Sequence, residues 1–119
     1  MSRLAYETGL SGEDAAQSYL QSKGFTSVAR RYRGADGEID LIMEDGDVVV
    51  FVEVKAAVRG QRGDGMVRVT ADKQRRMTHA AMTFLASREW MSRPARFDVV
   101  EITQSGLLHV PNAFAASAW

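Results

Sequence analysis

Two mostly apolar runs, residues 37–42 and 50–55, lie on either side of the dipeptide Asp45-Gly46. This arrangement predicts a β-hairpin, because Asp-Gly tolerates the positive φ values that a tight turn requires. Side chains alternate between the two faces of a strand, so one face of the ribbon is predicted to be wholly apolar. That face would carry Ile39, Leu41, Met43, Val48, Val50, Val52 and Val54.

The opposite face of the ribbon is apolar near the turn and charged at its open end. A turn closed symmetrically about this dipeptide places Asp40 opposite Phe51 and Glu38 opposite Glu53. Asp40 is then diagonal to Glu53, and Lys55 shares their face. Carboxylates this close repel one another, and a divalent cation such as Mg²⁺ or Mn²⁺ is the simplest compensation. A ladder of salt bridges on an exposed sheet face is the alternative.

Five further segments have helix or strand patterns. Ser11 resembles a helix cap, and Gly24 ends the helix that follows. Thr70 is the predicted cap of a second helix, which would run to about residue 87 or 90. The buried stripe of that helix would be Met77, Ala80, Ala81, Phe84 and Leu85. The predicted strands are residues 25–33, 96–103 and 107–110.

The predicted element order is therefore α-β-β-β-α-β-β. An antiparallel hairpin beside strands that are reached through a helix implies a mixed β-sheet flanked by helices, an α/β fold. The chain has 119 residues and shows no internal repeat or linker, which predicts a single domain over residues 1–119.

Composition narrows the class of protein. With 45% hydrophobic and 25% charged residues, the chain has the balance of a folded globular protein. The absence of cysteine excludes disulfides and thiolate metal sites, and fits a reducing compartment. The first residues lack the apolar core of a signal peptide, and the run from Val48 to Val52 is too short to cross a bilayer. We therefore expect a cytoplasmic protein with no membrane partner.

Charge is unevenly distributed although the formal net charge is zero. Between residues 59 and 76, six basic residues stand against only Asp64 and Asp72; they are Arg59, Arg62, Arg68, Lys73, Arg75 and Arg76. A second basic cluster, Arg30, Arg31 and Arg33, precedes the hairpin. Basic segments on both sides of the carboxylates favour contacts with nucleic acid, and solvated loops are the alternative.

The motifs of the chain resemble a known family. They are Gly12-Glu13, Gly37-Glu38-Ile39-Asp40-Leu41-Ile42, Phe51-Val52-Glu53-Val54-Lys55, Arg96-Phe97-Asp98-Val99-Val100 and Asn112-Ala113-Phe114. In this order they resemble the successive motifs of the bacterial YraN family. That family is similar to archaeal Holliday junction resolvases of the restriction-endonuclease-like superfamily, whose signature is Asp, a spacer, then Asp or Glu, any residue, and Lys. The resemblance implies a restriction-endonuclease-like core.

On this resemblance the signature corresponds to Asp40, Glu53 and Lys55, and Glu13 matches an additional helix carboxylate of the resolvases. It implies metal-assisted phosphodiester hydrolysis, in which Asp40, Glu53 and the backbone carbonyl of Val54 hold one or two Mg²⁺ ions. Lys55 would orient the attacking water or stabilise charge on the phosphate. Glu13 would complete the metal shell or act as a base, although it also suits a helix N-terminus.

Other candidates are weaker. Glu38 is a reserve carboxylate, and Asp98 either caps a loop or approaches the site. His79 and His109 lack partners at metal-ligand spacing, which predicts structural or surface roles. The expected nucleic-acid contacts are Arg31, Arg33, Arg59, Arg62, Arg68 and Lys73, of which Lys73 also suits a solvated helix position.

The first functional hypothesis is a Mg²⁺- or Mn²⁺-dependent DNA endonuclease acting on branched or junction DNA, with a homodimer allowed by the resemblance. The chain departs from the family in having Ala56-Ala57 after Lys55, where relatives usually have a basic residue. A noncatalytic nucleic-acid-binding or scaffold protein that keeps the nuclease fold is therefore the alternative. An interaction module in a repair or translation complex is the third.

Overall fold

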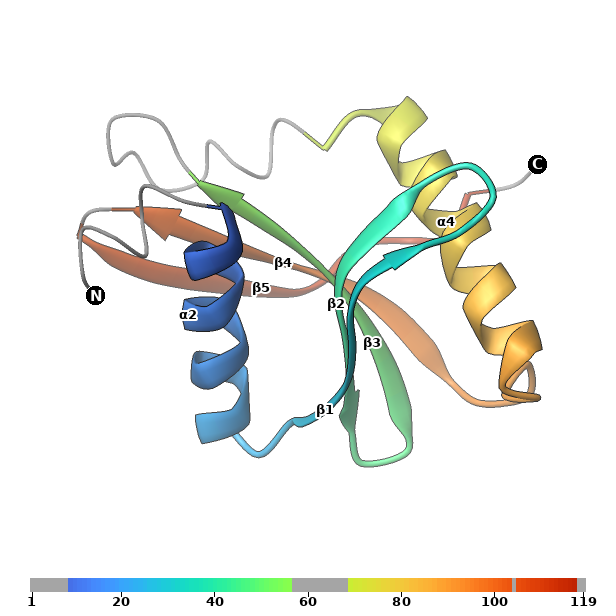
Figure 1. The fold of residues 1–119 in the computed structure, drawn as a ribbon, viewed down its shortest axis with the longest axis horizontal. Helices are drawn as coiled ribbons and strands as arrows, with labels where there is room; N and C mark the ends of the chain where they lie inside the picture. Colours follow the sequence, from blue (N-terminus) through green and yellow to red (C-terminus); the bar gives the residue numbers. More distant parts are fainter. Residues whose placement is uncertain (1–8, 57–68, 104, 118–119) are drawn as a thin grey trace.

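The structure, a computed structural model, describes residues 9–56, 69–103 and 105–117 (Figure 1). Its elements are α2 (Gly9–Ser22), β1 (Thr26–Arg33), β2 (Glu38–Asp45), β3 (Val48–Ala56), α4 (Ala71–Ser87), β4 (Ala95–Thr103) and β5 (Gly106–Phe114). This order confirms the predicted succession α-β-β-β-α-β-β. Neither of these helices is long and apolar enough to span a membrane.

One mixed sheet joins all five strands in the order β1-β2-β3-β4-β5. Neighbouring strands are antiparallel except β3 and β4, which are parallel. A parallel pair needs a crossover, and α4 lies between these two strands in the chain. The α/β class and the mixed sheet are thus as predicted, in the arrangement expected for a restriction-endonuclease-like core.

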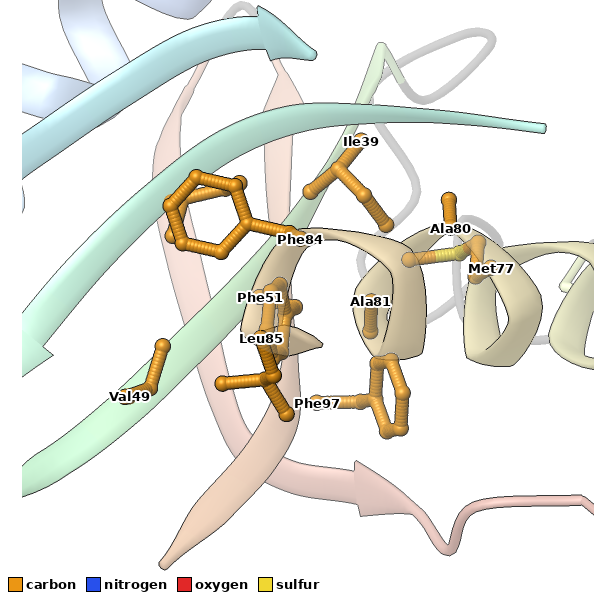
Figure 2. Close-up of a cluster of buried hydrophobic side chains, with 10 residues drawn as sticks. Ile39, Val49, Phe51, Met77, Ala80, Ala81, Phe84, Leu85 and Phe97 are labelled. Atoms are coloured by element: carbon orange, nitrogen blue, oxygen red, sulfur yellow. The ribbon is translucent and has the colours of Figure 1, made fainter. Parts of the chain in front are cut away.

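Each face of the sheet is covered by one helix (Figure 1). The stripe predicted for α4 is buried, and packs with Ile39, Val49, Phe51 and Phe97 of the sheet (Figure 2). Ile42 belongs to the same cluster. On the other face, α2 contributes Ala16 and Leu20. These pack with a second set of strand residues, Leu41, Met43, Val50, Val52, Val100 and Ile102.

The hairpin between β2 and β3 differs from prediction by two residues. Its strands end with the pair Asp45 and Val48, so the turn is Gly46-Asp47, and Gly46 has φ +62°. Ile42, not Asp40, lies opposite Phe51. The predicted pairs, Asp40 with Phe51 and Glu38 with Glu53, are therefore wrong. A shift of two residues keeps most side chains on the predicted face, because side chains alternate with a period of two.

Ile39 is the exception to that alternation. It packs with Ile42 in the cluster beneath α4, not on the predicted face with Leu41. The last pair of the β2–β3 ladder is Leu41 with Val52. Beyond this pair the backbone N–H of Val54 donates to Oδ2 of Asp40 at 2.8 Å. A side chain thus replaces a backbone partner, and strict alternation ends there.

The irregularity extends into β1. Arg31 lies between the pairs Arg30–Leu41 and Tyr32–Ile39, and it adopts φ +52°, in the left-handed region that few non-glycine residues occupy. Both strands are therefore distorted where Asp40 leaves the regular ladder.

The helix boundaries agree only in part with prediction. Thr70 is the N-cap of α4, since its Oγ1 accepts from the backbone N–H of Lys73 at 3.1 Å. The predicted cap Ser11 is wrong, because Ser11 lies within α2. The apolar stripe fixes which face of a helix is buried but does not fix its first turn. The chain leaves α2 through Gly24, which has φ +99°.

Strand β5 is longer than predicted and passes through Pro111. It pairs only with β4, so it is an edge strand, where a residue without an N–H is tolerated. A register shift lies between the pairs Phe97–Phe114 and Val99–Val110. Asn112, next to the proline, has φ +51°. The extra residues are accommodated as a bulge.

Two glycines bring the loop before β2 against α4. A Cβ on Gly37 would lie 2.8 Å from the carbonyl oxygen of Arg76, and one on Gly34 would lie 2.8 Å from Cα of Ala80. Both obstacles are backbone atoms, which move only if the helix moves. Because Gly37 directly precedes β2, this close approach fixes the start of the strand that carries Asp40.

Gly37→Ala is therefore expected to lower the free energy of unfolding by about 1–3 kcal/mol through overpacking. Ser18→Ala on the exposed face of α2 is the control, expected to change it by less than about 0.5 kcal/mol. Urea denaturation measures both. An unchanged midpoint for Gly37→Ala would contradict this packing.

Candidate functional site

Asp40 and Glu53 lie side by side at the open end of the hairpin. The last ladder pair is Leu41 with Val52, so these are the next residues outward on each strand. Their carboxyl groups lie within hydrogen-bonding reach of one another. Glu53 is buried, with 3% of its side chain exposed, and Asp40 is half-buried. The structure thus brings two acidic groups into direct contact, closer than the diagonal predicted for them.

This contact changes the acidity of Asp40. Burial and the charge of Glu53 raise the pKa of Asp40 from 3.8 to about 7, while the hydrogen bond from the Val54 N–H acts in the opposite direction. The charge of Glu13 raises it further. Two full negative charges at this position are therefore unfavourable without a cation.

Two lysines supply positive charge to this pair. Nζ of Lys73 lies 2.5 Å from Oε2 of Glu53, and Nζ of Lys55 lies 3.4 Å from the same oxygen. Burial alone would lower the pKa of Lys73, but its hydrogen bond to Glu53 and the charges of Glu53 and Asp40 raise it overall. The sequence placed Lys55 beside Glu53. It indicated Lys73 only as a nucleic-acid contact, and its contact with Glu53 was not predicted because no local pattern connects α4 with β3.

Glu13, on α2, acts electrostatically on the pair, since its charge raises the pKa of Asp40. Its residue is 7% exposed, and Oε1 is buried without a hydrogen bond from any residue that the structure describes. The nearest cations on this oxygen are Arg30 at 3.7 Å and Arg31 at 3.8 Å. Four residues of α2, from Gly9, precede Glu13, so Glu13 lies beyond the first turn and a role at the helix N-terminus does not explain it.

A cavity of about 180 Å³ opens beside the pair. Its lining contains Asp40, Glu53 and Lys73, together with Gly37, Glu38, Arg76 and Met77. The reserve candidate Glu38 is thus at the cavity, but its carboxylate also forms an ion pair with Arg33 at 3.0 Å.

The chemistry of these groups suits a hard divalent cation. Carboxylate oxygens are preferred ligands of Mg²⁺, and Oε1 of Glu13 is buried and lacks a hydrogen bond, although two arginines lie within 4 Å of it. Among residues 9–56, 69–103 and 105–117, no three acidic, histidine or cysteine side chains converge closely enough to hold a metal. Protein ligation by Asp40 and Glu53 alone still fits Mg²⁺, which usually keeps several waters.

The predicted nucleic-acid contacts are only partly placed. Arg31 and Arg33 are exposed on the edge strand β1, and Lys73 points to Glu53 instead of extending into solvent. Arg59, Arg62 and Arg68 lie outside the described residues.

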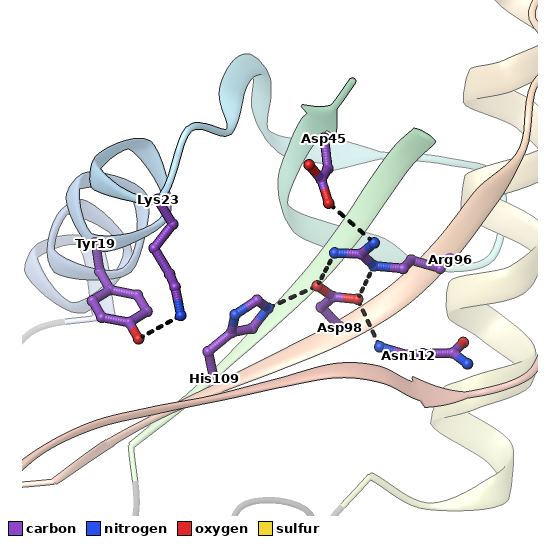
Figure 3. A network of polar contacts seen from close by, with 7 residues as sticks. All are labelled: Tyr19, Lys23, Asp45, Arg96, Asp98, His109 and Asn112. Atoms are coloured by element: carbon purple, nitrogen blue, oxygen red, sulfur yellow. Dashed lines mark hydrogen bonds and ion pairs between the residues drawn. The ribbon is translucent and has the colours of Figure 1, made fainter. Parts of the chain in front are cut away.

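Asp98 belongs to a different network (Figure 3). It is 0% exposed and accepts hydrogen bonds from Arg96 Nε at 2.9 Å and from the backbone N–H of Asn112 at 2.9 Å; Nε2 of His109 lies 2.8 Å away. These partners belong to β4 and β5, so Asp98 joins these strands and does not complete the carboxylate pair. His109 also packs edge-on against Phe25. This structural role agrees with prediction.

The other histidine, His79, contacts the carboxyl group of Asp36 through Nδ1. It therefore connects α4 to the loop between β1 and β2. Neither histidine lies in a metal-ligand cluster in the described part of the chain.

Comparison with known proteins establishes the relatives of this chain. The model of "Uncharacterised protein family UPF0102" matches residues 12–102. The chain belongs to the UPF0102 family. This confirms the resemblance to YraN proteins. The match includes Glu13, Asp40, Glu53, Lys55 and Lys73.

Individual UPF0102 relatives match over most of their length. The UPF0102 protein of Geobacter metallireducens is 42% identical over 110 residues, which cover 89% of this chain and 90% of the relative. That of Yersinia enterocolitica is 43% identical over 112 residues, 92% of this chain and 96% of the relative. That of Symbiobacterium thermophilum is 46% identical over 100 residues, which cover 83% of this chain and 84% of the relative. These matches establish family membership. The catalytic chemistry is inferred from the geometry of the site.

The Asp98 network predicts acid-dependent stability. Burial alone would raise the pKa of Asp98, but the bonds from His109, Arg96 and Asn112 lower it overall. A folded pKa below the unfolded value of 3.8 stabilises the protein above that pH, and this contribution is lost as pH falls through the folded pKa. Asp98→Asn should therefore lower the free energy of unfolding at pH 7 by about 3 kcal/mol.

Denaturation at pH 7 and at pH 3 measures this difference. It should shrink at pH 3, because the carboxyl group of the unfolded chain is then largely protonated and the folded state gains less from its ionised Asp98. The same difference at both pH values would contradict an ionic role for Asp98.

Proposed function

We propose that this UPF0102 protein is a Mg²⁺-dependent endonuclease that hydrolyses phosphodiester bonds of DNA. The observation that carries the proposal is the contact between the carboxyl groups of Asp40 and Glu53, with the Lys55 amine 3.4 Å from Glu53. An acidic pair followed by a lysine on the same strand is also what the resemblance to the resolvases requires.

A simple salt-bridge ladder explains this arrangement less well. Such a ladder alternates opposite charges on an exposed face, where each pair contributes little. Here two acidic side chains lie side by side, Glu53 is buried, and the pKa of Asp40 is raised to about 7. Strongly perturbed acids beside a cavity are typical of functional sites.

Asp40 and Glu53 would hold the metal, with the Val54 carbonyl as the proposed third oxygen. A bound Mg²⁺ would supply Lewis-acid polarisation of the phosphate and lower the pKa of the attacking water. The Val54 N–H, 2.8 Å from Oδ2, fixes the orientation of the Asp40 carboxylate before substrate arrives. Lys55, held on β3, would orient the water or stabilise charge on the phosphate oxygens. Glu13 would assist as a further carboxylate or base.

DNA is the proposed substrate because basic residues precede and follow the acidic pair in the chain. Arg31 and Arg33 are exposed on β1, and Arg59, Arg62 and Arg68 follow β3 in sequence. Phosphate contacts of this kind position a duplex without reading its sequence. Branched or junction DNA is the preferred substrate on the resemblance to the resolvases, which also favours a homodimer.

One observation favours the noncatalytic alternative. Lys73 already places an amine 2.5 Å from Glu53, so a protein cation compensates part of the acidic pair. A protein that keeps the fold and binds nucleic acid without turnover would need no metal to compensate the acidic pair beyond this lysine.

A cleavage assay over branched, flapped, nicked and linear duplexes with Mg²⁺ or Mn²⁺ tests the proposal. The wild type should cleave at least one substrate, and Asp40→Asn or Lys55→Met should slow cleavage by about 100-fold or more while DNA binding persists. Asp47→Asn in the exposed turn of the same hairpin should retain wild-type activity.

Two outcomes would contradict the nuclease proposal. Cleavage that survives both site substitutions would indicate a contaminant or another site. Salt-sensitive DNA binding by the wild type without cleavage of any substrate would support the noncatalytic alternative.

A further inference from the structure

Two amines contact one oxygen of Glu53, and they are held in different ways. Lys55 lies two residues from Glu53 on the same strand. Lys73 comes from the first turn of α4, where its own backbone N–H donates to the capping oxygen of Thr70 at 3.1 Å. The cap thus fixes the backbone of Lys73 while its side chain reaches Glu53 across the cavity.

The shorter of the two contacts is made by Lys73. Its Nζ lies 2.5 Å from Oε2, compared with 3.4 Å for Lys55. The charge of Asp40 also acts on Lys73, so its ammonium group serves the acidic pair and not Glu53 alone. One third of the Lys73 side chain is exposed, whereas Glu53 is buried. The lysine can therefore leave this contact for solvent more readily than the carboxylate can.

We infer that the Lys73 ammonium group is the resident counter-ion of the Asp40–Glu53 pair, and that a divalent metal displaces it from Glu53. A protonated amine and a metal ion compete for the same carboxylate oxygen, because each is stabilised by the same negative charge. Lys73 therefore stabilises the metal-free protein and weakens metal binding by competition. In taking Mg²⁺ as the competitor, this inference rests on the proposed function.

This assignment separates the two lysines. Lys55 remains beside Glu53 as the candidate for contact with water or phosphate, while Lys73 controls whether the acidic pair is open to the metal. Once the metal has displaced Lys73 from Glu53, its amine is available for the predicted contact with nucleic acid.

Lys73→Met tests the inference, because it removes the charge and keeps most of the side-chain length. Lys73→Gln is a second variant, which retains a hydrogen-bond donor. It keeps the inference testable if Lys73→Met fails to fold. Arg75→Met is the matched control, since Arg75 lies on the same helix and pairs with the exposed Asp72.

The first readout is thermal unfolding in EDTA. Lys73→Met should lower Tm by roughly 5 °C, because the acidic pair loses its counter-ion, whereas Arg75→Met should lower it much less. The second readout is calorimetric titration with Mg²⁺ alone. Both Lys73 variants should bind Mg²⁺ about tenfold more tightly than the wild type, and Arg75→Met should match the wild type.

Each contrary result has a distinct meaning. If the wild type binds Mg²⁺ and the Lys73 variants bind it equally or more weakly, the competition is refuted while the proposed metal site stands. An unchanged Tm of the Lys73 variants in EDTA would also overturn the counter-ion role. If neither the wild type nor the variants bind Mg²⁺ or Mn²⁺, the metal-dependent function fails, and the inference fails with it.

Discussion

The contact between the carboxyl groups of Asp40 and Glu53 is the constraint around which the site is built. Two adjacent carboxyl groups repel one another when both are ionised, and burial strengthens that repulsion. The surrounding groups oppose it: a backbone N–H bonds to Asp40, and two lysine amines approach Glu53. A fold that concentrates negative charge and surrounds it with donors is well suited to bind a cation, which is the basis of the proposed nuclease chemistry.

The sheet explains how residues so far apart in sequence meet. Asp40 and Glu53 come from neighbouring strands at the point where the β2–β3 ladder ends. The helices on the two faces then contribute from opposite directions, since α2 carries Glu13 and α4 carries Lys73. Gly34 and Gly37, in the loop before β2, lack a side chain and so allow the backbone of this loop to lie directly against α4. Backbone packing and the Val54 N–H bond thus position the acidic groups before any ligand binds, as electrostatic preorganisation requires.

The sequence predicted what depends on local periodicity. Alternation gave the shared face of Asp40 and Glu53, and helical spacing gave the buried stripe of α4. An error of two residues in the hairpin register did little harm, because an even shift preserves faces. Placing Ile39 failed for a physical reason: the Asp40 side chain replaces a backbone partner in the ladder, and no periodic pattern records this. The contact of Lys73 with Glu53 joins residues 20 apart through tertiary packing, and so it was beyond any local rule.

Anomalous diffraction from crystals soaked in Mn²⁺ tests whether Asp40 and Glu53 bind one metal together, because it locates the metal without reliance on activity. We expect one strong peak within coordinating distance of both the Asp40 and Glu53 carboxylates, and its absence from Asp40→Asn crystals. Soaked wild-type crystals with no peak at this pair, or with manganese bound only elsewhere, would contradict this expectation.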